Sequence, residues 1–247
     1  MLNRILACGL SAGLLVGLFA AALQLTFVSP LILKAEVYEE AASAAHASAP
    51  AHEHAAGAVD HDHGEGWAPE NGAERAAFTT LATVASTIGF ALMLVAAAAL
   101  SPAGLTVRTG VAFGLAGFAA TGLAPSLGLA PELPGSAAGD LLLRQGWWIA
   151  TAIATAAGIA LLAYGRPALK ALGVALMAAP HLIGAPVAGA PSSTAPAELS
   201  AAFAAQAIVV QAIVWTTLGA ACGYVWSRQE RSRTAARSKA PKSALAA

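Results

Sequence analysis

The feature that most constrains this chain is a series of six apolar runs, each close to the length of a membrane-spanning helix. A helix needs roughly 20 apolar residues to cross about 30 Å of hydrocarbon, because each residue rises about 1.5 Å. The runs cover residues 5–28, 78–100, 109–129, 146–164, 169–185 and 201–226. We therefore predict an all-α, polytopic membrane protein with six transmembrane helices. The fifth run is short and contains Pro180, so a re-entrant fifth segment would leave five.

The composition excludes an ordinary soluble domain. Hydrophobic residues make up 57% of the chain and charged residues only 11%, whereas globular proteins carry about a quarter charged residues. The first run follows Arg4, as a signal peptide would, but its apolar core is longer than the roughly 7–15 residues of a signal sequence. We expect an uncleaved helix there. Cys8 and Cys222 lie inside apolar runs and are interpreted as small buried residues.

The positions of the basic residues predict the orientation, because cytoplasmic loops are enriched in lysine and arginine. With a cytoplasmic N-terminus and six spans, ten of the thirteen basic residues lie inside. These are Arg4, Arg108, Arg166, Lys170, Arg228, Arg231, Arg233, Arg237, Lys239 and Lys242. A five-span arrangement would move the basic tail outside, so six spans are favoured. Both termini are then cytoplasmic, in a bacterial inner membrane.

This topology defines three parts of the chain. Residues 1–227 form a single transmembrane domain, residues 34–77 a periplasmic insert, and residues 228–247 a basic cytoplasmic tail that we expect to be disordered. A basic tail beside anionic lipid is typical of membrane proteins, so nucleic acid is not an expected partner. Glycines at every fourth position on the first run (Gly9, Gly13 and Gly17) and on the third (Gly110 and Gly114) predict close helix packing.

Polar residues inside the runs are costly and therefore informative. Many lie in the outer half, where prolines also gather. Either a polar cavity open to the outside or interhelical hydrogen bonding would explain them. The candidates for lining an ion pathway are Gln24, Thr83, Ser86, Gln145, Trp147, Trp148 and Gln206, with Thr79, Thr87 and Gln211 on the same outer halves. His181 follows Pro180 and is either a metal ligand or a hydrogen-bonded structural residue.

Five of the six histidines lie in or beside the polar insert, and two clusters combine imidazole with carboxylate. The candidate metal ligands are His52, His54, Asp60, His61, Asp62, His63 and Glu65. Such ligands suit borderline divalent cations such as zinc, nickel and cobalt. A low-complexity linker and a proton-sensing loop are the alternatives. We expect weak, poorly selective binding that is lost below about pH 6, because histidine protonates near pH 6.5.

Several stretches in this order resemble the predicted cobalt transporter subunit family CbtA. They are the opening run LNRILACGLSAGLLVGLFAAALQLTFVSPLILKAEVYE, then HDHGEGWAPENGAER, GFAATGLAPSLGLAPELPG, DLLLRQGWW, PHLIGAP and PAEL. The resemblance implies uptake of Co²⁺ for cobalamin synthesis and a partner of the CbtB type, a small single-span membrane protein with a histidine-rich end. It also implies five spans, in contrast to the charge argument. By matching motif it makes candidates of His61, His63, Trp67, Glu132, Gln145, Trp147, Trp148 and His181.

Three functional hypotheses follow. The first is a metal permease, for Co²⁺ or alternatively Ni²⁺ or Zn²⁺, that captures ions with the histidine-rich insert. The second is a metal-binding accessory or sensor subunit that does not conduct. The third, a membrane metalloenzyme, requires ligands on rigid elements together with a general base, and the clusters lie outside the predicted helices. We expect no catalytic activity and no permanently bound cofactor.

Overall fold

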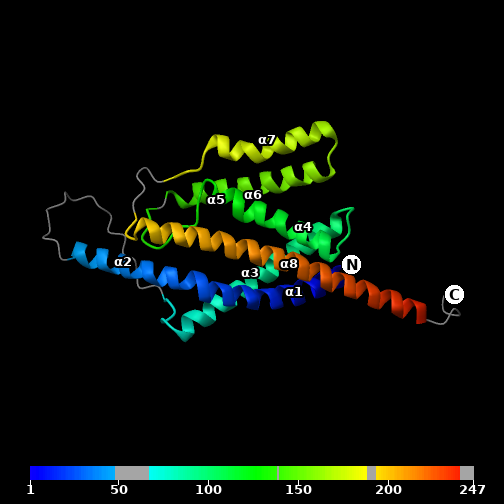
Figure 1. The fold of residues 1–247 in the computed structure, drawn as a ribbon, viewed down its shortest axis with the longest axis horizontal. Helices are drawn as coiled ribbons and strands as arrows, with labels where there is room; N and C mark the ends of the chain where they lie inside the picture. Colours follow the sequence, from blue (N-terminus) through cyan, green and yellow to red (C-terminus); the bar gives the residue numbers. More distant parts are fainter. Residues whose placement is uncertain (48–66, 138, 188–192, 240–247) are drawn as a thin grey trace.

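A computed structural model of the chain describes residues 1–47, 67–137, 139–187 and 193–239. The helices form an elongated bundle (Figure 1). In chain order they are α1 (Leu2–Leu23), the π-helix η1 (Gln24–Val28), α2 (Ser29–Ala47), α3 (Ala73–Leu100), α4 (Val107–Phe118), the π-helix η2 (Ala119–Leu123), α5 (Ala124–Ser126), α6 (Leu141–Tyr164), α7 (Pro167–Ile183) and α8 (Ala197–Lys239). The predicted all-α class is confirmed.

Within the described residues, five continuous helices are long and apolar enough to cross a membrane: Leu2–Ala45, Ala73–Leu100, Val107–Ser126, Leu141–Tyr164 and Ala197–Ala235. The shorter apolar helix α7, Pro167–Ile183, corresponds to the predicted fifth span. At about 1.5 Å per residue its 17 residues extend about 25 Å, slightly less than a typical hydrocarbon core. Pro180 does not end α7, which continues to Ile183.

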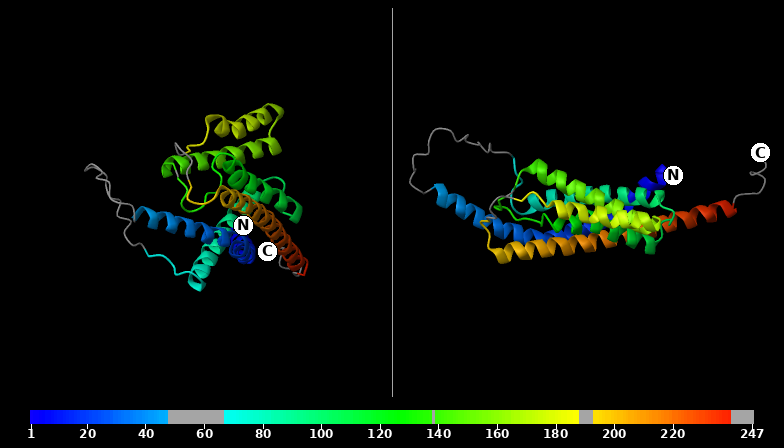
Figure 2. Two further views of the ribbon diagram at one scale, coloured as in Figure 1. Left: turned by 60° about the vertical axis from the view of Figure 1, so that its left-hand side comes forward. Right: turned by 90° about the horizontal axis from the view of Figure 1, so that it is seen from above.

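The successive long helices alternate in direction (Figures 1 and 2). One end of the bundle, here called the terminal end, holds residue 1, the α3–α4 and α6–α7 connections and the last turns of α8. The opposite end, the loop end, holds α2 and the connections that follow α5 and α7. Helix α7 lies antiparallel against α6 at the side of the bundle.

Two helices extend beyond the predicted apolar runs. Helix α2 continues to Ala47, into the insert predicted from residue 34, because residues such as Glu36, Glu39 and Glu40 favour helix and can be solvated beyond a bilayer. The tail was expected to be disordered from residue 228, but α8 continues to Lys239. Its alanine, arginine and glutamine residues are good helix formers that extend an existing helix without a new nucleation step.

Glycine faces hold the helices together in pairs. A Cβ atom on Gly13 would lie 2.6 Å from the Cα of Ile88, so α1 contacts the backbone of α3 there. A Cβ atom on Gly110 would fall on the Gly219 carbonyl, and one on Gly114 would fall on the Trp215 carbonyl. The predicted packing role of these glycines is confirmed. Because the hydrophobic effect does not drive helices together in lipid, close van der Waals contact must stabilise these pairs.

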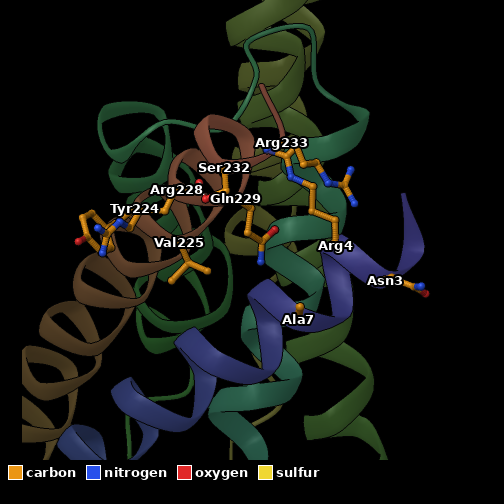
Figure 3. A pocket seen from close by; sticks show the side chains of 9 residues that line it. All are labelled: Asn3, Arg4, Ala7, Tyr224, Val225, Arg228, Gln229, Ser232 and Arg233. Carbon is orange, nitrogen blue, oxygen red and sulfur yellow. Dashed lines mark hydrogen bonds between the residues drawn. The ribbon is translucent and has the colours of Figure 1, made fainter. Parts of the chain in front are cut away.

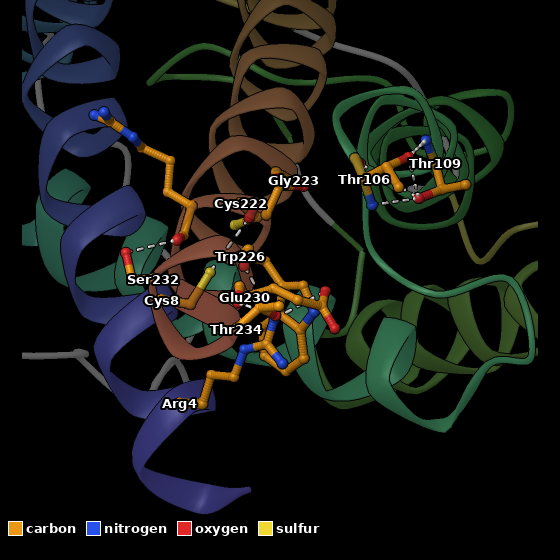
Figure 4. Close-up of polar contacts among 12 residues, drawn as sticks. Arg4, Cys8, Thr106, Thr109, Cys222, Gly223, Trp226, Glu230, Ser232 and Thr234 are labelled. Carbon is orange, nitrogen blue, oxygen red and sulfur yellow. Dashed lines mark hydrogen bonds and ion pairs between the residues drawn. The ribbon is translucent and has the colours of Figure 1, made fainter. Parts of the chain in front are cut away.

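The terminal half of the bundle is a dry core between α1, α3 and α8. Its fully buried members include Cys8, Ala12, Val95, Leu218 and Cys222. The expectation that both cysteines are small buried residues is confirmed, and the Cys8 thiol donates to the Cys222 carbonyl at 3.3 Å (Figure 4). Among the described residues, the buried polar side chains are Thr87, Thr151 and Thr155, and none of them belongs to this core.

Arg4 closes the dry core at the terminal end. Its Nη2 donates to the Trp226 carbonyl at 2.9 Å and lies 3.3 Å from the Glu230 carboxylate (Figure 4). The guanidinium carbon is 3.7 Å from the centroid of the Trp226 ring. Arg4 thus links the first turn of α1 to α8 by hydrogen bond, ion pair and cation–π contact.

At the loop end, connections that are distant in sequence contact one another. Thr194 donates its backbone N–H to the Gly135 carbonyl at 3.2 Å, which joins the α5–α6 connection to the segment before α8. A smaller apolar cluster that includes Val28, Leu133 and Phe203 lies beneath this contact. Arg75 on α3 forms a two-point ion pair with Glu36 on α2. These contacts hold α2, α3 and the loops together at the loop end.

The glycine contacts predict a sharp difference between two alanine substitutions. Gly114→Ala should destabilise the protein by about 1–3 kcal/mol, because the added methyl group overlaps the Trp215 carbonyl. Gly89→Ala on α3 is the control, because nothing lies within 4 Å of a Cβ atom there, and it should be neutral or slightly stabilising. Thermal unfolding in detergent measures both. Equal stability of the two variants would contradict the packing.

Candidate functional site

A cavity of about 470 Å³ lies between α1, α3 and α8, in the half of the bundle towards the loop end. Its polar lining consists of Gln24, Thr83, Ser86, Thr87 and Gln211. The Thr87 hydroxyl donates to the Thr83 carbonyl at 2.7 Å, as a helix hydroxyl commonly does. The remaining lining residues are mainly apolar or aromatic, and they include Pro131 of the α5–α6 connection. Side chains from three separate segments thus converge on one space.

One π-helix lines this cavity, and the other contacts one of its lining residues. Gln24 is the first residue of η1, and the inserted residue of a π-helix rotates the side chains that follow it. On η2, a Cβ atom on Gly122 would fall on the Oε1 atom of Gln211, so this glycine makes room for the Gln211 amide. Such π-helical turns often occur at functional sites in helices. The two glutamines are therefore positioned by irregular backbone on α1 and beside α8.

The cavity ends against the dry core. Trp215 and Leu218 line the cavity and also belong to the apolar cluster of the terminal half. The Trp215 ring in turn packs against Phe90 at 5.0 Å between ring centroids and lies over Gly117. Further towards the terminal end lie the buried Cys8 and Cys222, and then Arg4 against Trp226. The cavity is therefore closed by this apolar core on the side towards the terminal end.

A second group of candidates meets where α6 contacts α7. The Trp147 ring nitrogen donates to the Pro180 carbonyl at 3.2 Å, and the Trp147 and His181 rings meet edge to face with centroids 6.0 Å apart. Gly128 admits the Trp147 ring, since a Cβ atom there would fall on it. This arrangement anchors the end of α7 to α6. Gln145 and Trp148 are exposed on α6 and do not join the cluster.

Charged candidates at the loop end are paired. Glu132 forms an ion pair with Arg144, which fixes the α5–α6 connection to the start of α6. Glu36 is held by Arg75. Trp67, which is mostly exposed, packs edge to face on Phe78 of α3 at 5.0 Å. These contacts shape the loop end.

The histidine-rich candidates cannot be placed. His52, His54, Asp60, His61, Asp62, His63 and Glu65 lie outside the described residues. Among the residues that the structure describes, no group of three histidine, cysteine or acidic side chains could hold a metal ion. His181 accordingly has an aromatic neighbour and no ligand set around it in that part of the chain. The described site is a largely apolar cavity with five hydroxyl or amide side chains in its lining.

The structure brings together some of the pathway candidates. Gln24, Thr83 and Ser86 line the cavity, whereas Gln206 is exposed on α8 and is not among its lining residues. The sequence reasoning missed the apolar lining, above all Trp215 and Phe203. It also missed Gly122 as the space for Gln211. No sequence pattern marks a glycine as the contact of an amide on another helix, so only the packing in the structure reveals this pair.

Apolar helices of spanning length, paired through glycine faces around a polar cavity, define a polytopic helical membrane protein. The chain matches the CbtA family, described as "Probable cobalt transporter subunit (CbtA)", over residues 2–227. It therefore belongs to the CbtA family, and the resemblance inferred from its sequence is confirmed. No curated protein and no solved structure matches the chain.

The cavity predicts different chemical reactivity for two positions on α3. In a background where Cys8 and Cys222 are replaced by alanine, Ser86→Cys should react readily with a small hydrophilic thiol reagent, because Ser86 is exposed in the cavity wall. Leu94→Cys lies in the dry core and should react at least about tenfold more slowly, because burial withholds the thiolate from water. Similar rates at both positions would contradict a hydrated cavity that ends at Trp215.

Proposed function

We propose that the chain is the integral membrane subunit of a Co²⁺ uptake transporter that supports cobalamin synthesis, with Ni²⁺ or Zn²⁺ as other possible cargo. The observation that supports this most strongly is a cavity with hydroxyl and amide side chains in its lining, in a chain that belongs to a family of cobalt transporter subunits. Amide and hydroxyl oxygens can replace part of the hydration shell of an ion. Because they are neutral, they hold a divalent ion weakly enough to release it, as conduction requires.

The distribution of charge supports an orientation in which the terminal end is cytoplasmic. Four basic residues lie at that end of the bundle. Arg108 and Lys170 are in the first turns of α4 and α7, Arg166 directly precedes α7, and Arg228 is in the last part of α8. Only Lys34, Arg75 and Arg144 are basic at the loop end, among the residues that the structure describes, and two of them are paired with carboxylates. We therefore propose a bacterial inner membrane location with six crossings, α7 included, and the cavity on the periplasmic side.

In this proposal the histidine-rich insert raises the local concentration of metal at the mouth. The insert follows α2 and precedes α3 in the chain, and the Glu36–Arg75 pair joins these two helices. A divalent cation that enters down 100 mV gains roughly 4.6 kcal/mol, twice the value for one charge. That gain corresponds to about a 2,000-fold gradient, so the membrane potential suffices as the energy source in this proposal.

A second candidate is a non-conducting, metal-binding accessory or sensor subunit. The observation in its favour is that no ligand cluster occurs within the described part of the bundle. In either case we propose a small single-span membrane partner with a histidine-rich end, of the CbtB type, that completes the transporter. We propose no catalytic activity for the chain.

Reconstitution distinguishes the two candidates. The purified chain is placed in lipid vesicles with and without the single-span partner, and entry of Co²⁺ is followed with an internal metal-sensitive dye. Uptake by the chain alone supports the permease, and uptake only with the partner indicates shared conduction. Metal binding without uptake in either preparation would favour the accessory subunit.

Deletion of residues 46–65 tests the capture role of the insert. We expect the half-saturating Co²⁺ concentration to rise about tenfold with the maximal flux retained, since the loss is one of local concentration. Deletion of residues 240–247, which follow α8, is the control. Complete loss of flux on deleting 46–65 would show instead that the insert is part of the conduction path.

Substitution in the cavity tests the pathway. Gln211→Leu should lower the Co²⁺ flux at least about tenfold. The substitution removes from the cavity lining an amide oxygen that replaces hydration water of the ion. Gln206→Leu lies on the same helix outside the cavity and should retain the wild-type flux. If both variants conduct equally, ions do not pass Gln211.

A further inference from the structure

A second groove, unrelated to the ion cavity, lies at the terminal end between the first turns of α1 and the last turns of α8. Its volume is about 630 Å³. Figure 3 shows the side chains of Arg4, Arg228 and Arg233 around it, with Gln229 pointing into the space between the two helices. Its lining includes three arginines and no acidic residue. The groove therefore favours an anion.

Two buried polar atoms in this groove have no partner. Among the described residues, buried side-chain atoms without a hydrogen bond occur at Arg4 Nε, Gln229 Oε1 and Thr155 Oγ1, and the first two belong to the groove lining. Burying a polar group without a hydrogen bond is costly. Arg4 Nε requires an acceptor, and the Gln229 amide requires a donor. A ligand that fills the groove would supply both.

The polarity of the groove changes along its length. Arg233 and Ser232 lie about two turns further along α8 than Val225, and Asn3 lies about one turn before Ala7 on α1. Both helices thus run from charged residues at their ends to apolar residues deeper in the bundle. A phospholipid has the same gradient, with a phosphate and polar head at one end and acyl chains at the other.

Nearby groups leave the positive charge available. Glu230 pairs with Arg4 through Nη2 at 3.3 Å and does not line the groove. The Arg4 side chain is only 11% exposed, so its Nε–H points into the protein rather than to bulk water. Arg228 lies over the Tyr224 ring at 5.7 Å, which leaves its N–H groups for an anion. Arginine suits phosphate because its planar fork of donors matches the phosphate oxygens.

From these observations we propose that this groove binds the phosphodiester head of an anionic phospholipid. The phosphate accepts from Arg228 and Arg233. When the buried Arg4 and Gln229 side chains turn towards the groove, it also accepts from Arg4 Nε, and a head-group hydroxyl donates to Gln229. The acyl chains leave past Ala7 and Val225. Basic pockets between membrane helices are known to hold anionic head groups. A bound lipid would brace α1 against α8 at the sealed end of the bundle, beside the contact of Arg4 with Trp226.

Lipid titration of the purified full chain in uncharged detergent tests the proposal. Phosphatidylglycerol should raise the unfolding midpoint by about 2–4 °C and reach half of its effect at a concentration at least about tenfold lower than phosphatidylcholine does. At physiological ionic strength, surface attraction is screened beyond about 8 Å, so a remaining preference indicates contact. Equal effects of the two lipids would overturn the proposal.

Charge-matched variants locate the effect. Arg228→Gln/Arg233→Gln removes two charges from the groove, whereas Arg166→Gln/Lys170→Gln removes two charges from the same end outside it. Unfolding midpoints without lipid establish that both variants fold. The first should lose the tenfold preference and the second should keep it. Equal loss in both would show diffuse attraction rather than a site.

Glycerol 3-phosphate distinguishes the source of the anion. It carries the phosphate without acyl chains, so at equal concentration it should stabilise the protein far less than phosphatidylglycerol. Stabilisation as large as that by the lipid would assign the groove to a free phosphate compound and overturn the lipid assignment.

Discussion

Close contact between helix backbones is the constraint on which the rest of this structure depends. In lipid, apolar side chains gain nothing by meeting one another rather than acyl chains, so helices associate where small residues let their backbones touch. Gly110 and Gly114 on α4 do this against Gly219 and Trp215 on α8, and Gly158 meets Gly173 between α6 and α7. The glycines decide which helices pair, and the pairing decides where the bundle is sealed and where it is hollow.

The same constraint explains the unequal halves of the bundle. Along α1 the glycines lie towards the terminal end, where they bring α1 and α3 together around Val95 and Leu218. Beyond Gly17, α1 passes into η1 and α2, and polar side chains take the place of glycine contact. The cavity therefore begins where the close packing stops, and Trp215 marks the boundary. Any passage of an ion past Trp215 requires the helices to separate in the terminal half.

Much of this arrangement was predictable, and the failures have physical causes. Hydropathy located the helices, and glycine spacing located the packing faces. The polar residues of the outer half identified Gln24 and Thr83, but not which of Gln206 and Gln211 faces inward. Five residues on a helix amount to about 140° of rotation, and lipid and protein core are equally apolar, so hydropathy does not fix the rotation. The helical tail was missed because charge was interpreted as disorder.

In the proposed transporter, the cavity and the metal-binding candidates have different functions. Neutral oxygens such as those of Gln24 and Gln211 discriminate poorly among divalent ions, whose preferences depend on ligand type and geometry. Imidazole and carboxylate bind such cations more firmly, and in this sequence they occur together between α2 and α3. Strong ligands inside the bundle would also hold a divalent ion too firmly for release. In the proposed transporter, capture by the insert followed by weak binding in the cavity would allow both accumulation of metal and flux.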